Sequence, residues 1–227
     1  MLEERSAMQQ ERIDSLAQLS MAIAHQIRNP LMTIGGFAQL LERKGLLDTA
    51  GIGFVHNIRA GAKRLEAVVK AVAEYTATRN SDCRETDVAA LVQRTVERLA
   101  PLPPNVRIDA LPEGPSWSLD PDLAGDALYE VLNNAVEAMA SGGGVAQLRW
   151  REEERVCVFE ILDQGPGVSP EDAPFLFDPF FTTKTVGVGM GLAKARRWIR
   201  EQGGEVSLTN SQGGGTMAVL RIPAPSA

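Results

Sequence analysis

The chain has 227 residues, of which 44% are hydrophobic, enough for one large domain or two small ones with a buried core. Aromatic residues make up only 5%, which favours helices packed on helices or on a sheet over a β-sandwich. The net charge of −6 is uneven: residues 1–80 carry 10 Lys and Arg against 8 Asp and Glu, which leaves 13 against 21 for residues 81–227. We therefore expect no nucleic-acid partner.

The two cysteines, Cys83 and Cys157, lie far apart without clustered Cys or His residues, which argues against a disulfide framework and a structural zinc site. No apolar run approaches the roughly 18 to 20 residues of a membrane span. The first residues are too polar for a signal peptide. We expect a cytoplasmic segment without membrane contact, although a longer parent protein could be anchored in a membrane.

Two long helices are predicted in the first 80 residues. Apolar residues recur at helical spacing over 3–44 and again over 48–79, where the period is close to that of a helical bundle. Gly45 can end the first helix and Asp48 can cap the second, so the two should form an antiparallel hairpin. Since a single hairpin buries its apolar stripes poorly, we predict a homodimer in which two hairpins form a four-helix bundle.

The composition changes after residues 80–82, and residues 81–227 alternate strand and helix patterns. This order predicts an α+β sandwich, with one sheet covered by helices on one face. The predicted domains are therefore a helical hairpin at 1–80 and an α/β domain at 81–227. The expected helices cover 87–99, 121–139 and 190–202, and the expected strands 106–110, 116–119, 145–151, 156–163, 205–210 and 216–222.

The segment AHQIRNPL at 24–31 places a histidine on the first helix. At about 100° per residue, five apolar positions of this helix lie within roughly 20° of the direction opposite His25. They are Leu16, Ile23, Ile27, Ile34 and Leu41. His25 should therefore face solvent, where a neutral imidazole nitrogen is a good phosphoryl acceptor at pH 7. Pro30 should kink the helix just after it.

Further along the chain, Glu130 and Asn134 lie one turn apart on the polar face of the helix predicted at 121–139. Four clusters rich in glycine or aromatic residues follow, and glycines can let backbone N–H groups approach phosphates at a helix N-terminus. Any one cluster is weak evidence for phosphate binding, but the order and spacing of all four together are strong evidence. The clusters are DQGPG at 163–167, FDPFFTTK at 177–184, GVGMGL at 187–192 and GGGT at 213–216.

With these motifs, nearly the whole chain resembles a two-component sensor histidine kinase. Segment 24–31 is similar to the H-box, 130–139 to the N-box, 163–167 to the G1 box, 177–184 to the F-box, 187–192 to the G2 box and 213–216 to the last glycine box. The resemblance implies a dimeric helical hairpin followed by a Bergerat-type ATP-binding α/β sandwich. It also implies a response regulator receiver domain as partner.

The resemblance further implies a role for each matching position. His25 would be the phosphoacceptor, and Asn134 would hold the Mg²⁺ that bridges the phosphates of ATP. Asp163 would accept the adenine amino group, in a pocket completed by three further positions, Gly165, Gly167 and Thr216. The phosphates would face a lysine and the backbone of three glycines: Lys184, Gly187, Gly189 and Gly191.

Two positions depart from the family pattern. Where family members commonly carry an acid next to the phosphoacceptor, this chain has Gln26, whose amide can orient the imidazole but cannot take its proton. Where the N-box usually opens with Asn, this chain has Glu130. In the related gyrase-type ATPases, a Glu at this spacing is the general base. Glu130 either replaces the missing acid or helps to position metal or water.

Asn29 has two interpretations. It can position water for dephosphorylation of a regulator docked near His25, one helical turn away. It can also simply accommodate the following proline, because residues before proline avoid the helical region. His56, the only other histidine, has no motif around it and is interpreted as structural or surface.

Two other classes of protein remain as alternatives to the kinase. A serine kinase or ATPase of the same ATP-binding superfamily explains residues 81–227 but not the hairpin with an outward His25. A catalytically weakened phosphatase or scaffold explains Gln26 but does not require the retained nucleotide motifs.

Overall fold

The computed structural model describes residues 27, 31–43, 49–77, 79–110, 116–184 and 187–225, which form two compact units. One unit contains the helices up to residue 77 together with Lys184–Met190. The other contains Arg79–Thr183 and the residues from Gly191 onward. Within the described part of the chain, no helix is long and apolar enough to cross a membrane.

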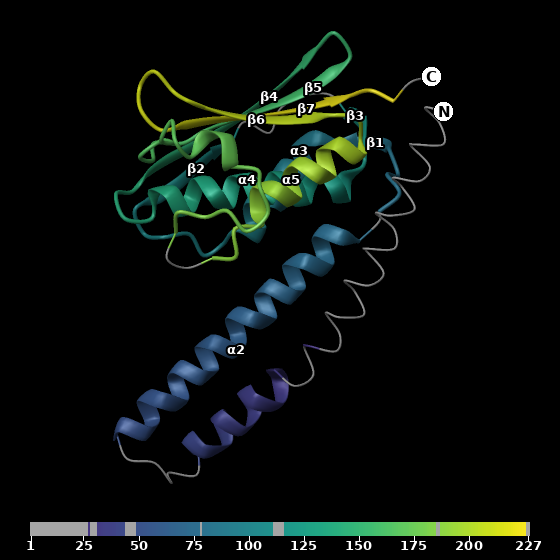
Figure 1. Cartoon of the computed structure of the whole chain (residues 1–227). Helices are drawn as coiled ribbons and strands as arrows, with labels where there is room; N and C mark the ends of the chain where they lie inside the picture. The colour runs from purple at the N-terminus through teal and green to yellow at the C-terminus, as the bar shows by residue number, and fades with distance from the viewer. Residues whose placement is uncertain are drawn as a thin grey trace. The chain divides into compact units, whose positions relative to one another are not determined.

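The first unit contains two helices that run side by side, one over residues 31–43 and α2 over Thr49–Thr76 (Figure 1). The Glu42 carboxylate links them by accepting hydrogen bonds from His56 Nε2 at 2.8 Å and Arg59 at 2.5 Å. These two donors lower the pKa of Glu42, His56 contributing most. His56 is thus a surface residue that joins two helices, as the sequence interpretation expected.

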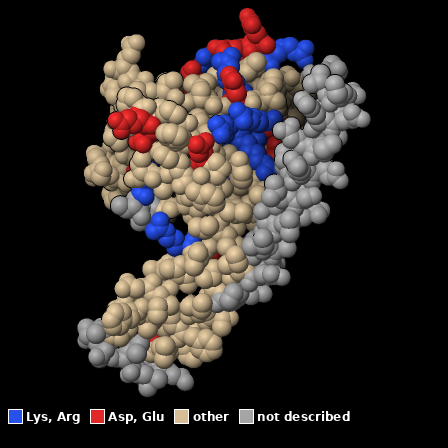
Figure 2. All heavy atoms as spheres, in the orientation of Figure 1, with Lys and Arg blue, Asp and Glu red and all other residues tan. Residues whose placement is uncertain are grey.

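Among the described residues of this unit, the apolar side chains are only partly buried. Five small or branched residues of these helices are buried: Leu31, Ala38, Val55, Val69 and Ala71. Nine large hydrophobic side chains on the same helices stay exposed: Met32, Ile34, Phe37, Leu40, Leu41, Ile52, Phe54, Ile58 and Leu65. Figure 2 shows one face of these helices, on which most side chains are uncharged.

The second unit contains a five-stranded sheet with the order β2-β4-β5-β7-β6. Strands β2 and β4 are parallel, and the other neighbours are antiparallel. Three helices lie on one side of the sheet (Figure 1), and the predicted α+β class is confirmed. The strands are β2 Val106–Ala110, β4 Gly144–Glu153, β5 Val156–Leu162, β6 Glu205–Asn210 and β7 Thr216–Pro223; the helices are α3 Val88–Arg98, α4 Pro121–Met139 and α5 Gly191–Glu201, with a short 3₁₀ turn at Ala173–Phe175.

Strand β3, Ser116–Leu119, does not join the large sheet, so the prediction of a single sheet is wrong. It pairs antiparallel with β1, Arg84–Asp87, a strand that the sequence patterns did not predict. Asp120 fixes this small sheet, because its carboxylate accepts from the backbone N–H of Asp82 at 2.8 Å. The same carboxylate caps α4 by accepting from the N–H groups of Asp122 and Leu123.

The core of the second unit lies between the large sheet and the helices. Helix α4 contributes its whole apolar arc to it, and alternate residues of β5 and β7 point into it. Its largest fully buried side chains include Phe159, Leu128, Leu132 and Ile199. The core therefore holds α4 in place along its apolar side, and the polar side of that helix faces away from the core.

Candidate functional site

Glu130 and Asn134 lie on the half-buried side of α4, opposite the core residues Leu128, Leu132 and Ala135. Glu130 is paired with Lys194 on α5, and Asn134 is not without a partner either. Their spacing of one helical turn places them on the same face, as predicted. We assign both residues to the candidate site.

Asp163, just beyond the end of β5, is buried, with 4% of its surface exposed. Its Oδ1 accepts hydrogen bonds from the backbone N–H groups of Gly165 at 2.8 Å and Thr216 at 3.1 Å. Neither of these bonds uses Oδ2, which can therefore accept from a ligand. A buried carboxylate held in this way is suited to read a donor such as an exocyclic amino group.

Glycines are required around Asp163 because the chain segments approach each other closely. Gly215 has φ +82°, and a Cβ there would overlap the carbonyl oxygen of Asp163. A Cβ on Gly165 would lie 3.0 Å from both Ala138 Cβ and Asp163 Oδ1. The last glycine box thus packs directly on the Asp163 turn.

Gly167 belongs to a second anchored turn. Asn210 at the end of β6 accepts from Val168 N–H at 2.7 Å and donates to Val168 O at 2.7 Å. Gly167 has φ +78°, and a Cβ there would lie 2.9 Å from Asn210 Oδ1. Asn210 therefore fixes the loop after Asp163, a role that the sequence patterns did not indicate.

Lys184, Gly187 and Gly189 belong to the first compact unit, so their approach to the same ligand as Asp163 stays a prediction. Gly187 and Gly189 both have positive φ, +142° and +71°, which favours glycine. Gly191 is the first residue of α5 and lies in the second unit. His25, Gln26 and Asn29 lie outside the described residues, and their predicted roles stay predictions.

Glu130 makes an ion pair that the sequence analysis missed. Lys194 on α5 places its Nζ 2.5 Å from Glu130 Oε1, and the two side chains are only 10% and 16% exposed. A signal was available, because Lys194 falls within the buried stripe of α5 beside Ala195, Trp198 and Ile199. A lysine in an apolar stripe needs a buried partner, but the partner lies on another helix and spacing cannot identify it.

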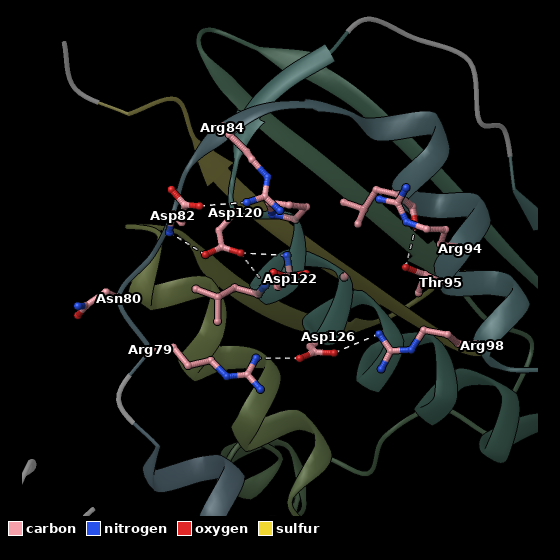
Figure 3. Close-up of a pocket in the computed structure, with 14 residues that line it drawn as sticks. Arg79, Asn80, Asp82, Arg84, Arg94, Thr95, Arg98, Asp120, Asp122 and Asp126 are labelled. Atoms are coloured by element: carbon pink, nitrogen blue, oxygen red, sulfur yellow. Dashed lines mark hydrogen bonds and ion pairs between the residues drawn. The ribbon is translucent and has the colours of Figure 1, made fainter.

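A separate cavity of about 800 Å³ lies where the segment 79–84 meets α3 and the start of α4 (Figure 3). Its charged lining is largely paired internally. Asp126 accepts from Arg79 at 2.8 Å and from Arg98 at 3.1 Å, and Asp82 accepts from Arg84 at 3.0 Å. The contact from Arg79 to Asp126 thus links the segment after α2 to α4. The lining of the cavity includes none of the residues predicted to bind the nucleotide.

Two family models match different parts of the chain. The model of the His Kinase A (phospho-acceptor) domain matches residues 15–79. The model described as "Histidine kinase-, DNA gyrase B-, and HSP90-like ATPase" matches residues 119–226. The chain belongs to the two-component sensor histidine kinases, with a helical hairpin and a Bergerat-type ATP-binding sandwich.

The matches to the following relatives and solved structure cover nearly all of the chain. Signal transduction histidine-protein kinase AtoS of Escherichia coli (strain K12) is 28% identical over 97% of this chain and 37% of its own length. Sensor protein kinase PilS of Pseudomonas aeruginosa is 30% identical over 91% of this chain and 40% of its own length. The chain thus spans less than half of these relatives. The crystal structure of histidine kinase ThkA in complex with response regulator protein TrrA matches with TM-score 0.67 and 25% identity, over 98% of this chain and 66% of that one.

Proposed function

We propose that the protein transfers the γ-phosphoryl group of ATP to His25 and from there to an aspartate of a response regulator receiver domain. The observation that supports this most is the buried Asp163 carboxylate, whose Oδ1 is held by Gly165 and Thr216 while Oδ2 is left for the adenine amino group. The match of residues 15–79 to a phospho-acceptor domain supports His25 as the acceptor of the phosphoryl group.

The residues at the site fit a nucleotide with Mg²⁺. The described residues contain no group of three His, Cys, Asp or Glu that could hold a metal by itself. Mg²⁺ is commonly held by one or two protein oxygens together with substrate phosphates, and the Asn134 amide oxygen suits this arrangement. Bound Mg²⁺ would neutralise phosphate charge. Lys184 and the N–H groups around Gly187, Gly189 and Gly191 would contact the phosphates.

The proton of His25 needs an acceptor when the imidazole attacks phosphorus, and Gln26 cannot serve. We propose Glu130 as that base, since it lies one turn from Asn134 on the same helix face. The competing role for Glu130 is to position metal or water. An unchanged rate of autophosphorylation in Glu130→Gln would contradict the role of Glu130 as the base.

A homodimer through the hairpin follows from the exposed apolar side chains of α2 and of residues 31–43. The receiver domain would dock on the hairpin near His25, as a regulator accompanies the related kinase ThkA in its crystal structure. Asn29, one turn from His25, would position water for dephosphorylation of that regulator. Phosphatase activity toward the partner is therefore part of the proposal.

The test is incubation of the purified protein with Mg²⁺ and γ-labelled ATP, followed by analysis of the bound label. Label that is acid-labile, alkali-stable and lost in His25→Ala supports the proposal. His56→Ala is the matched control, because His25 and His56 are the only two histidines of the chain. Label retained in His25→Ala, or stable in acid, contradicts a histidine kinase.

One observation favours a second function. Gln26 removes the usual acid, so a chain that binds ATP but incorporates no label would act instead as a phosphatase or scaffold through Asn29. The readout is the lifetime of a phosphorylated receiver domain with and without Asn29→Ala. A serine kinase or ATPase of the same superfamily would give acid-stable label or free phosphate instead.

A further inference from the structure

The ion pair between Glu130 and Lys194 links two helices of the second unit. Helices α4 and α5 lie side by side (Figure 1). The two charged groups form an ion pair that joins these helices. Lys194 Nζ lies 2.5 Å from Glu130 Oε1 and 5.3 Å from the centre of the Trp198 ring. The ammonium group therefore has both an anionic and an aromatic partner.

Stability alone is a weak reason for this pair. The desolvation of two nearly buried charges offsets much of their attraction, and apolar residues of similar size often stabilise as well or better. The neighbouring positions Ala195 and Ile199 show that this stripe of α5 otherwise buries apolar side chains. A lysine here is better explained by what it does to the Glu130 carboxylate.

The other carboxylate oxygen is also confined. A Cβ at Gly191 would lie 2.8 Å from Glu130 Oε2, so that oxygen lies directly against the first residue of α5. A helix N-terminus favours negative charge, and α5 has no acidic residue of its own in its first turn. Glu130 is thus oriented at Oε1 by Lys194 and at Oε2 by the start of α5.

We propose that Lys194 is a positioning residue, which holds Glu130 in the orientation in which it accepts the proton of His25. This inference rests on the proposed kinase function. In the step, one imidazole nitrogen bonds to the γ-phosphorus, the bridging P–O bond breaks to release ADP, and the proton of the other nitrogen passes to Glu130. Lys194 keeps its own proton and touches neither substrate nor phosphoryl group.

The first experiment measures single-turnover autophosphorylation at saturating ATP, together with ATP affinity. Because a general base contributes roughly 10²- to 10⁴-fold, misorientation of Glu130 in Lys194→Met should lower the rate by about 10- to 100-fold. ATP affinity should stay near that of the parent. Lys194→Arg retains the positive charge and should recover part of the lost rate.

The matched control is Arg197→Met, which removes an ion pair to Glu201 at 2.9 Å on the same helix without touching Glu130. Its rate should equal that of the parent. If Arg197→Met and Lys194→Met lose the same factor, the effect belongs to helix α5 as a whole and the positioning role is wrong.

The decisive comparison places Lys194→Met in a Glu130→Gln background. A residue that acts only through Glu130 has no further effect once the carboxylate is gone, so the double variant should match Glu130→Gln. The double variant also avoids an unpaired buried charge, which protects its folding. An equal loss in both backgrounds would show a merely structural lysine and overturn the inference.

The outcomes separate this inference from the proposed function. Absence of acid-labile label in the parent overturns the kinase proposal. A parental rate in Glu130→Gln overturns the base assignment and the role of Lys194 with it. A slow Glu130→Gln beside a parental Lys194→Met overturns the positioning role alone.

Discussion

The two compact units differ in how far they bury their large apolar side chains. In the α/β unit the large side chains of α4, β5 and β7 close on one another, and only Phe175 and Phe180 are large hydrophobic residues left exposed among its described positions. In the hairpin, large side chains such as Phe37, Phe54 and Ile58 stay exposed along both helices. The described helices of the first unit thus leave apolar surface of the kind that binds a partner, whereas the second unit has a core of its own.

The largest expected effect tests the closed core. Phe159 is fully buried and packs near Trp150, with ring centres 6.5 Å apart, so Phe159→Ala should lower the free energy of unfolding by about 3–5 kcal/mol. Chemical denaturation followed by tryptophan fluorescence measures this unit alone, because Trp117, Trp150 and Trp198 all belong to it.

The control for this substitution is Phe175→Ala. Phe175 is 49% exposed, and its removal should change the free energy of unfolding by about 0.5 kcal/mol. Equal losses for the two phenylalanines would show that the core of the α/β unit is not closed as described.

The second prediction tests the open stripe of the hairpin. A charge introduced by Ile58→Glu or Leu65→Glu would have to be desolvated at the interface between two copies, so either variant should be monomeric. Light scattering after size exclusion measures the mass. Lys63→Glu is the matched control on the opposite side of α2 and should remain a dimer. Dimers in all three variants would place the interface elsewhere.

The third prediction compares the two cysteines. Burial raises the pKa of the Cys157 thiol to about 12, so the folded protein at pH 8 holds it as an unreactive thiol. Cys83 is exposed and should react alone with iodoacetamide. Mass spectrometry should find one adduct in the folded protein and two after denaturation. Early modification of Cys157 would show that the sheet opens readily.

The sequence predicts the regular elements well where the apolar pattern is strong. Helix α4 matches the expected residues 121–139, because a proline at its first position and ten buried positions define it. Strand β1 could not be predicted, since its four residues RETD contain a single buried position, Thr86. Its pairing depends on β3 and on Asp120, which are distant in the sequence.

The candidate site is likewise predictable from the sequence only in part. The motif order was sufficient to bring forward Glu130, Asn134 and Asp163 as site residues. The contacts that orient them come from other segments: Lys194 for Glu130, and Thr216 for Asp163. Such pairs depend on how α5 and β7 pack, and no spacing within one helix or loop determines that packing.

The smallest expected effect concerns acid and the contact between the two hairpin helices. The hydrogen bond from His56, with help from Arg59, lowers the pKa of Glu42 below its ordinary value of 4.5. Folding therefore favours the carboxylate: its contribution is complete above pH 4.5 and is lost as the pH falls through the lowered value. Helicity by circular dichroism should decline slightly over this acidic range in the parent, while Glu42→Gln should be less helical at neutral pH and show a smaller decline. A parent and variant with identical acid profiles would mean that the Glu42 contacts do not hold the helices together.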